Sequence, residues 1–131
     1  MKVFFSNFYN KPDSNINSKA DNNTSEAHFQ LKIDDVLIGD LSFNNSIWTF
    51  IYSNQFKNQT KYHRLVGFPD LDKEYKSDVL WPFFKTRIPG LRQPSVLEIL
   101  ERKKISRSDE SKLLKLFGKF SPTNPFILES I

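Results

Sequence analysis

Residues 79–100 (VLWPFFKTRIPGLRQPSVLEIL) constrain the fold more than any other stretch of the chain. They hold three of the seven prolines, one of the two tryptophans and one of only four glycines. Proline fixes φ and removes a backbone donor, so it is tolerated in the first turn of a helix but not in its interior. The pattern predicts a short aromatic helix with its N-cap at Ser77 or Asp78, Pro82 in its first turn, and its end at residues 88–90.

Two more helices are predicted after this one. The first would run from Pro94, a residue favoured at the first helical position, to about Lys104. Its apolar stripe would consist of Val96, Leu97 and Leu100. The second would end at Gly118, and Ser106 and Asp109 ahead of it have the spacing of a capping box. Its inward residues would be Leu113, Leu114 and Phe117.

Three segments before residue 53 are predicted to be strands with short turns between them, and in the first of them apolar and polar residues alternate. The three segments are residues 28–33, 36–43 and 47–52. Period-two alternation is typical of strands with one buried face, and short turns join antiparallel neighbours. The sequence therefore predicts a three-stranded meander. Gly39 within it indicates a bulge or a close approach of two backbones.

The third of these strands should place Trp48, Phe50 and Tyr52 on one face and Ile47, Thr49 and Ile51 on the other. Residues 53–76 are polar and irregular except for 65–69, which is predicted to be extended or a short strand. A last strand is expected at 126–128. The predicted fold class is α+β, with a small antiparallel sheet (a meander or partly closed barrel), two to three short helices and a final strand.

The chain divides into a polar arm and a single domain. Residues 1–27 contain an Asn/Ser/Asp-rich tract with little apolar surface to bury, so a flexible arm is expected, with a possible edge strand at 3–9. Residues 28–131 are long enough to form one core. Neither a signal peptide nor a membrane span is recognisable, and no cysteine is present. A soluble, cytoplasmic protein is therefore expected.

No catalytic constellation can be identified. His28 and His63 lie in separate polar contexts, and neither is expected to act as a base or a ligand. The acidic pairs 34–35 and 70/72 have the context of solvated turns. Phosphate-binding loops and metalloprotease or kinase motifs are absent from the sequence. The expectation is a protein that is not an enzyme, with no cofactor and no bound metal.

The charge is uneven along the chain. Residues 85–119 carry ten Lys/Arg against four Asp/Glu, a balance of +6, whereas the net charge of the whole chain is +4. A basic region can meet nucleic acid or an acidic protein face, or it can simply be a solvated helix surface. In the nucleic-acid alternative, Trp48, Phe50 and Tyr52 would stack on bases. Direct nucleic-acid binding is not favoured, because acidic residues are mixed among the basic ones.

Two motifs resemble the N-terminal subdomain of the HipA family of serine/threonine kinase toxins. Residues 36–41 followed by 48–52 are similar to the family's V-G-x-L and x-x-F-x-Y strands, and Phe83-Phe84 followed by 88–90 is similar to F-F-x-x-L-L-P-[DE]-G. Residues 113–118 match the position of a leucine-containing helix that ends in glycine. The chain departs from the pattern at Gly90, which directly follows the proline, and at Arg87, which replaces an apolar residue.

The resemblance implies a function through a partner. The sequence ends before a kinase core would begin, which resembles the HipS antitoxins of three-part HipBST systems. It implies a non-enzymatic antitoxin that binds and inhibits a HipA- or HipT-like kinase, with a HipB-like DNA-binding protein reached through the complex. A subunit that completes a truncated kinase is the alternative. The partner-binding residues would be Trp81, Phe84, Arg87 and Arg92, with Trp81 as the main contact or else as part of the core.

Overall fold

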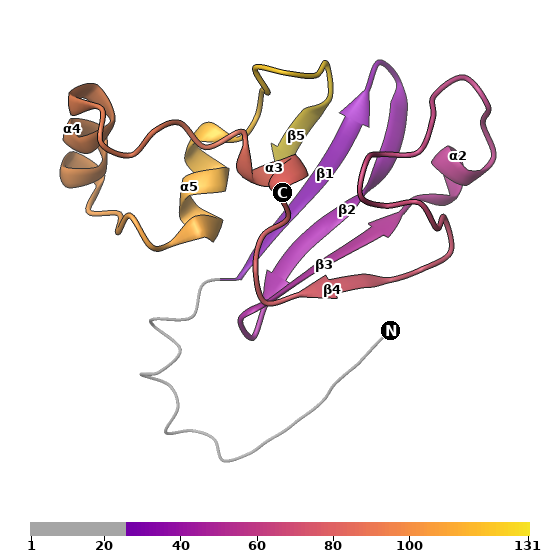
Figure 1. Cartoon of the computed structure of the whole chain (residues 1–131), viewed down its shortest axis with the longest axis horizontal. Helices are drawn as coiled ribbons and strands as arrows, with labels where there is room; N and C mark the ends of the chain where they lie inside the picture. The colour runs from indigo at the N-terminus through magenta and orange to yellow at the C-terminus, as the bar shows by residue number, and fades with distance from the viewer. Residues whose placement is uncertain (1–25) are drawn as a thin grey trace, which may run out of the picture.

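A computed structural model describes residues 26–131 and shows one antiparallel sheet with short helices (Figure 1). The predicted arm and the possible edge strand at 3–9 therefore lie outside the described residues, apart from the last two residues of the arm. Five strands form the sheet in the order β4-β3-β2-β1-β5. They are β1 (Ala27–Ile33), β2 (Val36–Asn44), β3 (Ile47–Tyr52), β4 (Tyr75–Ser77) and β5 (Ile127–Ser130). The fold is α+β, as predicted.

The meander formed by β1, β2 and β3 is confirmed. Its two turns contain two residues each, because Ile33 is paired with Val36 and Asn44 with Ile47. Asp34, Asn45 and Ser46 adopt positive φ values of 52°, 53° and 64°. Such values are typical of tight hairpin turns, and Asn and Asp tolerate them better than most residues.

The predicted irregularity at Gly39 is also present. The register shifts so that Ile38 has no partner on β1: Gly39 faces Leu31, and Leu37 faces Lys32. A Cβ at Gly39 would lie 2.5 Å from the carbonyl oxygen of Ile51 and 2.8 Å from the Phe50 ring. Glycine is required here by the close approach of the neighbouring strand.

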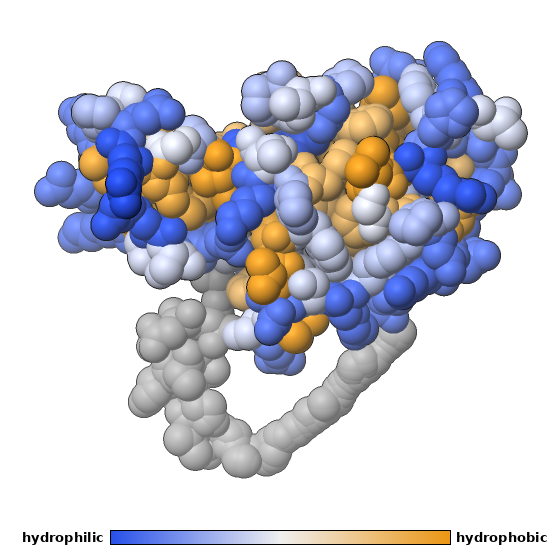
Figure 2. Space-filling model, in the orientation of Figure 1, coloured by the Kyte–Doolittle hydropathy of each residue, from blue (hydrophilic) through white to orange (hydrophobic). Residues whose placement is uncertain are grey.

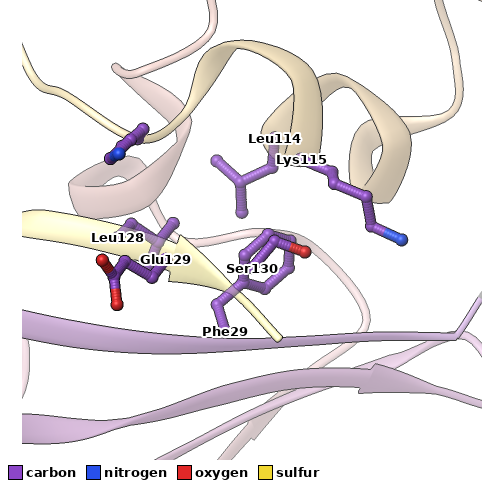
Figure 3. Close-up of a pocket in the computed structure, with 7 residues that line it drawn as sticks. Phe29, Leu114, Lys115, Leu128, Glu129 and Ser130 are labelled. Atoms are coloured by element: carbon purple, nitrogen blue, oxygen red, sulfur yellow. The ribbon is translucent and has the colours of Figure 1, made fainter.

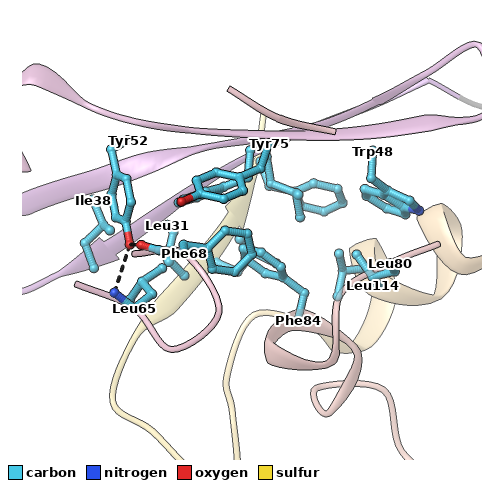
Figure 4. Packing of buried hydrophobic residues seen from close by; sticks show 14 of the residues in the cluster. Leu31, Ile38, Trp48, Tyr52, Leu65, Phe68, Tyr75, Leu80, Phe84 and Leu114 are labelled. Carbon is cyan, nitrogen blue, oxygen red and sulfur yellow. Dashed lines mark hydrogen bonds between the residues drawn. The ribbon is translucent and has the colours of Figure 1, made fainter. Parts of the chain in front are cut away.

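One face of the sheet carries the main hydrophobic core. Trp48, Phe50 and Tyr52 of β3 are buried, while Ile47 and Ile51 on the other face are exposed, as the alternation predicts. Figure 4 shows Trp48 and Tyr52 on this face, with Leu80 and Phe84 from the segment that crosses the sheet. The sheet is open rather than partly closed, because β4 and β5 each pair with a single neighbour on one side.

Four short helices are described, one more than the upper end of the prediction. They are α2 (Asn54–Lys57), α3 (Pro82–Lys85), α4 (Pro94–Lys103) and α5 (Glu110–Phe117). Helix α2 was not predicted, although Ser53 caps it by accepting a hydrogen bond from the Phe56 amide. β4 was not predicted either. The prediction of a short strand or extended segment at 65–69 is wrong, since this segment forms a turn around Gly67, which has a φ of 92°.

The aromatic helix α3 is shorter than expected. Its N-cap is Trp81, not Ser77 or Asp78, because Ser77 belongs to β4 and residues 78–80 form a bend and an irregular stretch. The helix ends at Lys85 with Thr86 as its C-cap, so residues 88–90 lie beyond it. Pro82 is at the first helical position, where its missing N–H leaves no hydrogen bond unmade.

Helices α4 and α5 pack on each other around a second hydrophobic cluster of Val96, Leu100 and Leu113. Leu97 is exposed, so its prediction as a core residue of α4 is wrong. Asp109 is the N-cap of α5, whereas Ser106 accepts a hydrogen bond from the Ser108 amide and takes no part in a capping box.

Gly118 ends α5, as predicted, but for a different reason. Its φ is −88°, which any residue can adopt. A Cβ at this position would lie 2.5 Å from the carbonyl oxygen of Leu114 and 2.6 Å from the Leu114 side chain. The glycine is needed for space rather than for a left-handed backbone.

Candidate partner-binding surface

The segment from β4 to the start of α4 crosses the core face of the sheet and alternates between buried and accessible side chains. Val79 is 58% exposed, and Leu80 is buried. Trp81 and Phe83 are half-buried, while Phe84 is 0% exposed. The segment consists of a short irregular stretch after β4 and the four-residue helix α3, which begins at Pro82. Neither is long enough to bury all of its apolar side chains, so buried and accessible residues alternate.

Rings from three parts of the chain meet at this segment. Phe68, on the loop before β4, packs against Trp81 with ring centroids 5.2 Å apart and against Phe84 at 6.0 Å. Phe83 lies 5.1 Å from Phe84 and 6.0 Å from Phe126, near the C-terminus. We call Val79, Trp81, Phe83 and Phe126 the aromatic surface. Figure 2 shows hydrophobic surface beside α3 and between α3 and the loop that precedes β4.

Arg87 is inside the protein, with 3% of its surface exposed. One terminal nitrogen donates hydrogen bonds to the carbonyl oxygens of Gly118 (3.0 Å) and Lys119 (3.2 Å). The other donates to Asn124 Oδ1 (3.2 Å) and to the carbonyl oxygen of Phe126 (3.0 Å). Burial lowers the pKa of Arg87 to about 10, but the four acceptors favour the charged form. The guanidinium therefore remains charged at neutral pH and holds the segment after α5.

The four predicted partner-binding residues thus lie in different environments. Arg92 is exposed and lines a pocket between two loops, and Trp81 is half-buried at the N-cap of α3. Phe84 and Arg87 are buried, so they could touch a partner only if this segment opened. Partner binding by these residues stays a prediction, and the geometry makes Trp81 and Arg92 the accessible ones.

Sequence reasoning missed the loop residues that support Trp81. Tyr52 donates a hydrogen bond to the carbonyl oxygen of Phe68 (2.7 Å) and accepts one from the Leu65 amide (2.8 Å). These bonds place Phe68 under Trp81, and the Tyr52–Leu65 contact is visible in Figure 4. Burial raises the pKa of Tyr52 to about 12, so the hydroxyl stays a donor. The sequence did offer one indication of this loop: a tyrosine on the buried face of a strand needs hydrogen-bond partners for its hydroxyl group.

A second pocket, of about 450 Å³, lies under α5 (Figure 3). It is lined by Phe29, Leu114, Lys115, Lys119, Leu128, Glu129 and Ser130. Leu114 points from the helix toward Phe29, whereas the amino group of Lys115 points away. Since the apolar side chains here are already buried against one another, the pocket offers mainly polar groups to solvent.

The residues that were considered as catalytic, metal-binding or base-stacking groups do not form a site in the described part of the chain. His28 is exposed and lies 3.4 Å from Asp40, and His63 is also exposed. Within residues 26–131, no group of three metal-ligating side chains comes together. Trp48, Phe50 and Tyr52 are buried, so these rings are not available to stack on bases. Over the same residues, no helix is long and apolar enough to cross a membrane.

Fold and surface together define a small α+β domain whose accessible aromatic side chains lie on short loops and helix ends. The family model for the HipA N-terminal domain matches residues 29–122, more than half of the chain. The chain therefore belongs to the HipA N-terminal domain family, and the match is to that domain and not to a kinase domain. Among curated proteins, none matches the sequence.

Proposed function

We propose that the chain is a non-enzymatic, antitoxin-type protein that binds a HipA- or HipT-like serine/threonine kinase and inhibits it. The observation that carries the proposal is the match of residues 29–122 to the HipA N-terminal domain, a domain that belongs with such kinases. In this function it acts in the cytoplasm. A HipB-like DNA-binding protein would join through the kinase rather than by direct contact with this chain.

The inhibition would be steric. The exposed part of residues 77–92 docks against the kinase cleft, with Trp81 as the main contact, because large aromatic residues dominate interface energetics. Val79 and Phe83 extend this contact along the aromatic surface. Arg92 faces acidic groups of the kinase. Phe84 and Arg87, being buried, contribute by holding the segment in shape.

The test is co-expression with a HipA-like kinase encoded beside the gene, scored by capture of the complex and by growth. A stable complex that restores growth supports the proposal. A complex that forms while growth stays inhibited contradicts inhibition and favours a subunit that completes the kinase. Failure to form a complex contradicts the kinase partner altogether.

A further inference from the structure

The pocket that contains Arg92 lies between the loop from α3 to α4 and the loop from α4 to α5. Its volume is about 690 Å³, and it is lined by Gly90, Leu91, Arg92, Arg107 and Ser108. Leu91 packs against the second hydrophobic cluster and provides the apolar part of the lining. Figure 2 shows hydrophobic surface between α4 and α5 with hydrophilic atoms on either side. Two arginines thus share one pocket with an apolar residue.

The charges of this pocket are not balanced within the described residues. Arg92 and Arg107 are both exposed, and neither makes a hydrogen bond or an ion pair with any residue in 26–131. The acidic residues at the start of α5 contact lysines: Glu110 lies 3.3 Å from Lys85, and Asp109 lies 3.9 Å from Lys112. Among residues 26–131, the two guanidinium groups therefore have no anionic partner.

The chemistry of the lining favours a carboxylate on a protein segment. An arginine fork matches a carboxylate with two parallel hydrogen bonds, and Leu91 can pack against the aliphatic part of a glutamate. A nucleic-acid backbone would instead need a continuous basic track. On α4 and α5 the basic residues are interrupted by Glu98, Glu101 and Glu110.

We propose that Arg92 and Arg107 form a binding site for the acidic side chain of a protein segment that enters the pocket between the two loops. The site extends the role that the proposed function gives to Arg92, but it is inferred from the pocket residues and its test needs no kinase. None of the residues that line the pocket belongs to a strand, so a partner would contact the two loops rather than the sheet.

The test uses the isotope-labelled full chain and a synthetic peptide in which two glutamates flank a leucine. We expect the peptide to shift the backbone amide resonances of Gly90, Leu91 and Ser108. In R92Q and in R107Q the dissociation constant should rise about tenfold, which corresponds to about 1.4 kcal/mol. The control variant is R102Q, an exposed arginine of α4 outside the pocket, and it should bind like the wild type.

Two comparisons complete the test. A peptide with glutamines in place of the glutamates should not bind, and the affinity of the acidic peptide should fall as salt is raised. Equal binding of the glutamine peptide, or unchanged affinity in R92Q and R107Q, would overturn the proposal. Tighter binding of a single-stranded oligonucleotide that shifts amides along both helices would also overturn it, in favour of a nucleic-acid surface. Thermal melts of each variant confirm that the fold is retained.

Discussion

Arg87 is a buried cation whose hydrogen-bond acceptors are three backbone carbonyls and one amide oxygen. Within the described residues, no carboxylate forms an ion pair with it. Its Nε has no hydrogen-bond partner, so the desolvation of the side chain is only partly compensated. The role of Arg87 is geometric, because its planar guanidinium group connects the loop after α3 to residues 118–126.

Replacing Arg87 with methionine should destabilise the protein strongly. The change leaves buried carbonyl oxygens without a donor, and we expect a loss of about 3 kcal/mol in the free energy of unfolding, the range seen when buried polar networks are broken. R87K should recover only part of the loss, because one ammonium cannot reach both pairs of acceptors. Urea unfolding measures this, with exposed R92M as the control. A loss below about 0.5 kcal/mol in R87M would contradict this role.

The contribution of Arg87 should not change with pH near neutrality. Its pKa in the folded protein is about 10, below its ordinary value, so the folded state binds fewer protons than the unfolded state only at high pH. Stability gained by deprotonation would therefore appear only as the pH rises above about 10. The R87M effect should be the same at pH 6 and pH 8 in urea unfolding, and a marked difference would show that another group titrates with it.

Substitution of Trp81 tests whether its side chain is a contact with the partner or part of the core. If it is the main contact with the kinase, W81A should weaken the complex by about 2 kcal/mol or more, while the free protein stays folded. Phe120, which is 64% exposed, offers a matched control as F120A. Calorimetry of binding and thermal melts of the free variants measure the two effects. Loss of folding in W81A would instead assign Trp81 to the core.

At the scale of elements, the loop between α2 and β4 is held by two tyrosines of the sheet. Tyr52 bonds to Leu65 and Phe68. Tyr75 accepts a hydrogen bond from the Asp70 amide (2.7 Å) and donates to the Asp70 carbonyl oxygen (3.2 Å). A loop with little regular structure therefore keeps Phe68 in a fixed place beneath Trp81.

Y52F should loosen this loop. Removing the hydroxyl leaves the buried Leu65 amide and Phe68 carbonyl without their partner, at a cost of about 1–3 kcal/mol. Hydrogen exchange should rise at the Leu65 amide, and the melting temperature should fall. Y62F is the control, because the Tyr62 hydroxyl contacts Asp34 near the surface and its loss should cost less than about 0.5 kcal/mol. Equal effects of the two changes would contradict the assignment.

The edge of the sheet contains an ion pair that can be followed by titration. Lys32 on β1 and Glu129 on β5 are 2.8 Å apart, and the hydrogen bond from Lys32 lowers the pKa of Glu129. K32Q should raise this pKa toward its ordinary value, as measured by NMR of the carboxyl carbon. Because the pKa of Glu129 is lowered in the folded protein, the ion pair stabilises the fold at pH values above the ordinary pKa of the carboxyl group. This stabilisation is lost as the pH falls through the pKa of the folded state.

The control for this titration is K76Q, which removes the ion pair with Glu74 (3.6 Å). It should leave the pKa of Glu129 unchanged. If K32Q also leaves that pKa unchanged, the β1–β5 ion pair does not persist in solution.

The longer strands and helices were predicted well from the sequence, whereas two of the shortest elements were missed. Alternation identified β1, and the short turns identified β2 and β3 as its successive partners. Proline located the start of α4, and glycine located the end of α5. Three- and four-residue elements such as β4 and α2 have too few residues to show a period, so they were missed. Helix α3 was misjudged at its start because residues 78–80 are irregular rather than helical, which a proline in the first turn does not reveal.

The candidate site was only partly predictable. The number of aromatic residues around Trp81 indicated a special segment, but single-sequence reasoning could not separate accessible rings from buried ones. Arg87 was predicted to bind a partner and not to be buried, since buried arginines are rare and its carbonyl acceptors lie more than 30 residues away in sequence. Arg107 was not singled out because the pocket it shares with Arg92 forms only when two loops meet.

At the scale of the whole molecule, α5 joins two hydrophobic clusters. Leu114 packs into the main core on the sheet, whereas Leu113 belongs to the cluster with α4. Ile88 packs against both. The aromatic surface and the pocket of Arg92 are therefore parts of one connected structure. A partner that touched both surfaces would rely on α5 and Arg87 to keep them in a fixed arrangement.

The most direct test of the proposed function is the activity of a purified HipA-like kinase from the same genome, measured while the full chain is added in increasing amounts. We expect phosphorylation to fall to background as the complex saturates, and W81A to require a much higher concentration for the same effect. Undiminished kinase activity in a saturated complex, or activity that depends on the chain being present, would contradict inhibition and identify the chain as a structural subunit.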